Sequence, residues 1–94
     1  MENKKYLDKV IGSLVRGTRI DYENERIIFP FPVSSPPSPY FSLFRFFSLS
    51  SSASFLHPFS TYCKNTFGLT EEEIEYVYKK YRDIIKDKIS NSEP

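Results

Sequence analysis

The sequence contains few of the residue types that usually form catalytic, metal-binding or phosphate-binding sites. It contains one cysteine, Cys63, one histidine, His57, three glycines and no tryptophan. A single cysteine excludes a disulfide within the chain and a metal site made of cysteines alone. The glycines form no phosphate-binding loop, and no serine lies in a G-x-S-x-G pattern. Cys63 is best interpreted as a small buried apolar residue.

A catalytic site is not indicated by any arrangement of residues. His57 and Cys63 lie six residues apart, with no orienting third group beside them. The acidic run at 71–75 is typical of the solvated first turn of a helix rather than of a carboxylate pair. We therefore expect no catalytic residue, no metal ligand, no cofactor and no enzymatic activity.

The chain also lacks an excess of charge of one sign and a long hydrophobic run. It has 13 Lys and Arg against 12 Asp and Glu, a net charge of +1, so no overall field favours nucleic acid or acidic membranes. The most apolar stretch, 40–59, is interrupted by serines, a proline and two polar residues, and is not expected to span a bilayer. Residues 1–9 do not have the pattern of a signal peptide. We expect a soluble, intracellular protein.

The pattern that is present predicts one small α+β domain over 1–94, beginning with a helix and a β-hairpin over 3–29. Four apolar residues recur at helical spacing between 7 and 14 and predict an amphipathic helix, which Gly17 would end in a left-handed conformation.

The alternation that follows this helix predicts a β-hairpin with a two-residue loop at 24–25. That register pairs Tyr22 with Ile27. It also pairs Ile20 with Phe29, so all four side chains lie on one face of the hairpin.

The segment 30–57 differs in composition and is expected to be an irregular or disordered linker. Residues 30–62 hold six of the seven prolines, ten serines and seven of the nine phenylalanines. Proline and serine disfavour regular pairing, but so many aromatic rings are unusual for a solvated linker. We expect these rings to contact a partner. The candidate contacts are Phe41, Phe44, Phe46, Phe47 and Phe55, together with Tyr76 of the helix that follows.

The last segment, 58–90, predicts a pair of helices joined at Gly68. Thr70 and Glu73 have the spacing of a capping box. Leu69 and Ile74 have the spacing of a hydrophobic staple, and an apolar stripe continues from there at helical spacing.

These features predict a small non-enzymatic accessory protein that acts by protein–protein interaction, with an unknown protein partner and a possible homodimer. A nucleic-acid-binding module that uses the helix–turn–helix-like pair 59–89 is an alternative. It is disfavoured because the second helix of the pair begins with glutamates. A basic face formed by Lys5, Lys9 and Arg16 on the first helix is interpreted as an ordinary solvent face.

A weaker alternative is association with a membrane surface through the phenylalanine-rich segment. It is disfavoured because that segment has one basic residue, Arg45, and many serines, whereas an interfacial helix needs a basic polar face and a clean apolar face.

Overall fold

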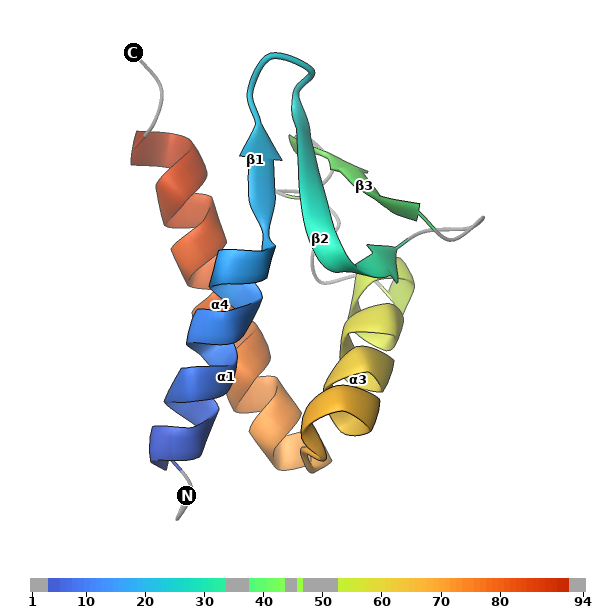
Figure 1. Cartoon of the computed structure of the whole chain (residues 1–94), viewed down its shortest axis with the longest axis vertical. Helices are drawn as coiled ribbons and strands as arrows, with labels where there is room; N and C mark the ends of the chain where they lie inside the picture. The colour runs from blue at the N-terminus through green and yellow to red at the C-terminus, as the bar shows by residue number, and fades with distance from the viewer. Residues whose placement is uncertain (1–3, 34–37, 44–45, 47–52, 92–94) are drawn as a thin grey trace.

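The computed structural model describes residues 4–33, 38–43, 46 and 53–91, and shows an α+β fold (Figure 1). The elements in chain order are α1 (Lys4–Gly17), β1 (Arg19–Asp21), β2 (Arg26–Val33), β3 (Ser38–Ser42), α3 (Ala53–Phe67) and α4 (Glu71–Asn91). Helices α1 and α4 lie side by side and run in the same direction, while α3 lies under the far end of β2 (Figure 1). The predicted fold class is confirmed.

Helix α1 buries the predicted apolar stripe, which consists of Leu7, Val10, Ile11 and Leu14. The role predicted for Gly17 is wrong, because the described residues with positive φ are Glu25 and Gly68. A Cβ atom at Gly17 would lie 3.1 Å from the Cβ atom of Pro30. Gly17 therefore allows β2 to approach the end of α1 closely.

The three strands form an antiparallel sheet in the order β1-β2-β3. The first hairpin pairs Ile20 with Ile27 and Asp21 with Arg26, so its loop has four residues, 22–25, and the predicted two-residue loop is wrong. The register is shifted by two residues from the prediction. Because side chains alternate with a period of two, an even shift leaves Ile20 and Ile27 on the same face.

Side-chain hydrogen bonds explain why the longer loop forms. The carboxylate of Asp21 accepts hydrogen bonds from the backbone N–H of Asn24 at 3.2 Å and from its side-chain amide at 2.9 Å. The N–H of Glu25 donates to the carbonyl of Tyr22 at 3.3 Å. Asp21 thus closes an Asx-type turn, and Tyr22 leaves the sheet.

The expectation of an irregular segment over 30–57 is wrong for a large part of it. Strand β2 continues to Val33, β3 follows, and α3 begins at Ala53 rather than at 58. The β2–β3 ladder is irregular between Ile28 and Val33. Prolines in this stretch of β2 have no N–H to donate, so they interrupt the ladder without preventing it. Residues 34–37, 44–45 and 47–52 lie outside the part that the structure describes.

The corner between α3 and α4 has the predicted features. Gly68 has a φ of 66°, and its N–H donates to the carbonyl of Lys64 at 3.1 Å. The capping box is reciprocal: the N–H of Glu73 donates to Oγ1 of Thr70 at 3.2 Å, and the N–H of Thr70 donates to Oε1 of Glu73 at 2.9 Å.

One apolar core joins the elements, and aromatic rings occupy its centre. Ile27, Phe29 and Phe31 alternate along β2 and are all buried, so they form the inner face of the sheet. On α3, Phe55 and Phe59 lie one turn apart and face this surface. Burial of these two rings stabilises α3 although Pro58 lies inside it and removes a helical hydrogen bond.

Candidate functional site

Two of the predicted partner contacts, Phe46 and Phe55, are completely buried within the chain. Their ring centroids are 5.8 Å apart, and the ring of Phe55 lies edge-on to that of Phe29 at 5.2 Å. The expectation that these two rings are available for contact outside the chain is therefore wrong. The expectation was wrong because β2 and α3 form regular secondary structure in a segment whose proline and serine content predicted none. The two rings are buried against these elements.

The other predicted phenylalanines are only partly described. Phe41 belongs to β3, where its backbone pairs with Ile27. The side chain of Phe41, and both Phe44 and Phe47, lie outside the described residues.

Among the predicted contacts whose side chains the structure describes, Tyr76 stays partly accessible. It is half-buried beside α1, and its hydroxyl donates to Oδ1 of Asp8 at 3.4 Å. The Nζ atom of Lys80 lies over its ring, 5.9 Å from the centroid. A hollow of about 220 Å³ beside the ring is lined by Glu72, Glu75, Tyr76 and Lys79. Tyr76 thus remains a candidate contact.

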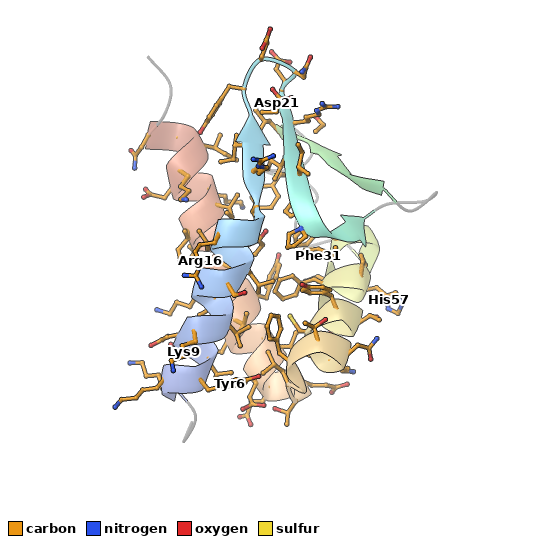
Figure 2. The ribbon with its side chains drawn as sticks, viewed as in Figure 1. Tyr6, Lys9, Arg16, Asp21, Phe31 and His57 are labelled. Carbon is orange, nitrogen blue, oxygen red and sulfur yellow. The ribbon has the colours of Figure 1, made fainter. Side chains whose placement is uncertain are left out.

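Cys63 and His57 do not form a shared site. The side chain of Cys63 is fully buried, and burial raises the pKa of its thiol to about 12. His57 is exposed and points away from the core (Figure 2). The thiol is therefore neutral near pH 7. The side chain of His57 points in another direction, so it is not placed to act as a base toward this thiol.

Two other features are absent from the part of the chain that the structure describes. No group of three or more His, Cys, Asp or Glu side chains among these residues is placed to hold a metal ion. Within the same residues, no helix is both long enough and apolar enough to cross a membrane.

An apolar groove between α3 and α4 is the clearest candidate binding site. It has a volume of about 360 Å³ and is lined by Leu56, Phe59, Ser60, Glu71, Ile74, Glu75, Tyr78 and Lys79. The lining residues recur at three- and four-residue spacing on each helix, so one face of α3 meets one face of α4 here. Phe59, Ile74 and Tyr78 are largely covered and form its floor. Leu56 and Ser60 are half-buried and form its α3 side.

Charged side chains surround the mouth of this α3–α4 groove. Nζ of Lys64 lies 3.6 Å from Oε1 of Glu71, and Nζ of Lys79 lies 3.2 Å from Oε1 of Glu75. All four side chains are well exposed, so each pair contributes little to stability and its members can pair with another molecule at small cost.

Sequence reasoning found only part of this groove. Ile74 and Tyr78 belong to the apolar stripe that the sequence showed. Leu56 and Ser60 were missed because the helix was expected to begin at 58. The spacing of Leu56, Phe59 and Ser60 is helical, and would have been the available signal.

The helix–turn–helix-like interpretation receives no support from the arrangement of α3 and α4. In such folds the start of the second helix enters the major groove. At the start of α4, Glu71 and Glu72 are exposed and would repel phosphates.

Comparison with known proteins adds no further constraint. No protein-family model, curated protein or solved structure matches this chain. The function is therefore argued from the geometry of the chain itself.

Proposed function

We propose that this chain is a small non-enzymatic accessory protein that binds a protein partner through the α3–α4 groove. One observation carries the proposal. A hollow of about 360 Å³ lies between α3 and α4, bounded by half-buried Leu56 and by the small exposed edges of Ile74 and Tyr78, and it is large enough to receive an apolar side chain. Grooves between helices commonly receive apolar anchors from a partner segment.

The charges around the groove favour a partner segment that carries Lys or Arg next to its apolar anchor. Glu71 and Glu75 line the groove and pair with Lys64 and Lys79, whereas the exposed Glu72 lines the adjoining hollow and forms no ion pair with a described residue. Three acids thus stand against two lysines at the mouth, which leaves an excess of one negative charge. A cationic residue of the partner is attracted there, and an acidic residue is repelled.

The size of the groove indicates a weak, transient complex. Burial of one aliphatic or aromatic anchor contributes about 1.5–3 kcal/mol. Each exposed ion pair adds about 0.2–1 kcal/mol. These contributions come to about 5 kcal/mol at most before an association cost of several kcal/mol, so the groove alone gives a dissociation constant of about 1 mM or weaker, and tighter binding requires contacts outside it.

The absence of enzymatic activity belongs to the same proposal. It is supported by the surroundings of Cys63, whose thiol is buried and has a raised pKa, so that it is not a reactive thiolate. His57 is exposed on another side of α3. The groove itself is lined by apolar side chains, by Ser60 and by the exposed charged side chains of Glu71, Glu75 and Lys79.

A matched pair of variants tests the groove. Ser60→Phe places a ring inside it, and Thr61→Phe places the same ring one residue away on the exposed side of α3. Short random peptides displayed on phage are selected against the wild-type chain, and the enriched peptides are titrated into all three proteins with ¹⁵N-detected NMR.

We expect the enriched peptides to contain an apolar residue next to Lys or Arg and to shift the resonances of Leu56 and Glu75. Their affinity should fall by about tenfold or more in Ser60→Phe, a loss of about 1.4 kcal/mol, and stay within about twofold in Thr61→Phe. Failure to enrich any peptide, or equal binding to all three folded proteins, contradicts the proposal. Concentration-dependent self-association that Ser60→Phe abolishes would instead assign the groove to a second copy of the chain.

A further inference from the structure

The outer face of α1 carries a line of cationic side chains. Lys5, Lys9, Ser13 and Arg16 follow one another at three- or four-residue spacing and are all exposed. Figure 2 shows Lys9 and Arg16 on the surface of α1. We call the surface defined by these four residues the α1 basic face.

The charge of this face is not compensated within the described residues. Helix α1 contains four cations, at 4, 5, 9 and 16, and one acid, Asp8, so its net charge is 4 − 1 = +3. None of the four cations forms an ion pair with a described residue. Asp8 lies on the side of α1 that faces α4, where it accepts the hydrogen bond from Tyr76.

Helix stability does not account for this distribution of charge. The first turn of α1 holds Lys4 and Lys5 and no acid, although cations at the positive end of a helix dipole are unfavourable. Helix α4 has the favourable arrangement, with glutamates in its first turn. The lysines of α1 thus add to the positive potential of its first turn instead of offsetting it.

Small residues leave space along the α1 basic face. A Cβ atom at Gly12 would lie 3.3 Å from Nη1 of Arg16, so the guanidinium lies back along the helix over Gly12, toward Lys9. The cationic line from Lys5 to Arg16 covers eleven helical steps, or about 16 Å at ~1.5 Å per residue. That length corresponds to about five nucleotides at the ~3.4 Å axial rise of one strand.

We propose that the α1 basic face binds the phosphate backbone of a nucleic acid. A membrane is a poorer match, because Leu7, Val10, Ile11 and Leu14 of α1 are packed in the core and the α1 basic face itself has no apolar side chain to insert between lipids. Contacts to phosphates carry no sequence information, so no dependence on base sequence is expected. This surface and the α3–α4 groove share no residue, so the two proposals are independent.

Salt dependence gives the quantitative test. About three contacted phosphates predict a slope of log K against log salt of about −2 to −3. Fluorescence anisotropy with labelled single-stranded and duplex DNA is measured from low to physiological salt. We expect binding at low salt with that slope, and no dependence on base sequence. Failure to bind at low salt contradicts the proposal.

Matched variants locate the surface. The triple variant Lys5→Gln, Lys9→Gln and Arg16→Gln removes the three cations of the face. The control removes three exposed lysines of α4, through Lys79→Gln, Lys80→Gln and Lys88→Gln. We expect the first to lose at least tenfold in affinity and most of the salt slope, and the control to lose clearly less. Equal losses in the two variants contradict the proposal.

Two substitutions at the single position Gly12 provide a sharper test. Gly12→Glu introduces a carboxylate between Lys9 and Arg16, where only the flexible end of Arg16 must move, and Gly12→Gln has nearly the same shape without the charge. We expect Gly12→Glu to abolish binding and Gly12→Gln to retain most of it, with circular dichroism confirming that both are folded. The proposal is wrong if the wild type sediments with anionic vesicles and Gly12→Glu does not, while both proteins bind DNA equally well. In that case the α1 basic face binds lipid.

Discussion

At the scale of single residues, burial determines the protonation states of Cys63 and Tyr81. Burial raises the pKa of the Cys63 thiol to about 12 and also raises the pKa of the Tyr81 hydroxyl. The hydroxyl of Thr18 donates its one hydrogen to the carbonyl of Leu14 at 2.7 Å, so the neighbouring Tyr81 hydroxyl donates to Thr18 Oγ1. Both Cys63 and Tyr81 are therefore neutral, structural groups in the folded chain.

These two raised pKa values predict a loss of stability in alkali. The unfolded chain releases the Cys63 proton above its ordinary pKa of 9.0, and the folded chain keeps it until about 12. The unfolded state then binds fewer protons, so the free energy of unfolding falls with rising pH, by up to about 1.4 kcal/mol per pH unit for each group. Urea denaturation between about pH 8 and pH 10 measures it. Cys63→Ala should show a smaller fall, and an identical fall in both proteins would contradict this assignment.

The glycines of α1 predict opposite effects of the same substitution. Gly12→Ala should stabilise the chain by about 0.5–1 kcal/mol, because alanine favours the helix and only the flexible end of Arg16 must move. Gly17→Ala should destabilise it by a similar or larger amount, because the new methyl group meets the ring of Pro30 at 3.1 Å. Thermal unfolding of the two variants measures both signs. A stabilising Gly17→Ala would show that β2 does not approach α1 as described.

At the scale of elements, α4 begins where the sequence says it should, because its start depends on local hydrogen bonds. Thr70→Ala removes the acceptor for the N–H of Glu73, and should lower the free energy of unfolding by about 1 kcal/mol. Thr70→Ser retains the hydroxyl and is the control. A double-mutant cycle with Glu73→Ala should show non-additivity, since each side chain serves the backbone of the other. Strictly additive losses would contradict a reciprocal capping box.

The hairpin shows the limit of local prediction at this scale. The alternation of apolar residues correctly indicated two strands, and the shared face of Ile20 and Ile27 was right. The loop length was wrong, because the side chain of Asp21 bonds Asn24 and Arg26 and so favours a wider turn than 24–25. Those bonds also lower the pKa of Asp21, with the Asn24 side chain as the largest cause.

At the scale of the whole molecule, hydrogen bonds connect segments that are distant in the sequence. The hydroxyl of Tyr6 in α1 donates to the carbonyl of Phe67 at 2.8 Å, at the end of α3. The hydroxyl of Tyr22 in the first hairpin loop donates to the carbonyl of Lys88 of α4 at 3.4 Å, a long and exposed bond that contributes little to stability. The N-terminal third of the chain is thus connected to both C-terminal helices.

The central rings predict a large loss of stability when one is removed. Phe55→Ala should lower the free energy of unfolding by about 3–5 kcal/mol, because it leaves a cavity among Phe29, Phe46 and Phe59. Phe55→Leu should cost less and keep the chain folded if the alanine variant is too unstable to study. Tyr22→Ala, at an exposed ring, is the control and should cost little. A loss below about 1 kcal/mol for Phe55→Ala would mean that this ring is not in the core.

Only part of the candidate site could be predicted from the sequence. Ile74 and Tyr78 were recognisable because α4 has a strong helical period and a capped start. Leu56 and Ser60 were not, because Pro58 and the serines before it weaken every local signal for the first turns of α3. The predicted contacts Phe46 and Phe55 were misplaced for the same reason.

By itself, the sequence determined the features that depend on neighbours along the chain: the stripe of α1, the Gly68 corner, the cap of α4 and the α+β class. The tertiary structure alone decided that Phe31, Phe46, Phe55 and Phe59 are buried. Local propensity is a weak constraint in a segment rich in proline and serine, whereas the burial of several aromatic rings against β2 contributes far more free energy. That burial overrides local preference, and among the described residues it leaves a hollow between α3 and α4, which is the surface that we propose for a partner.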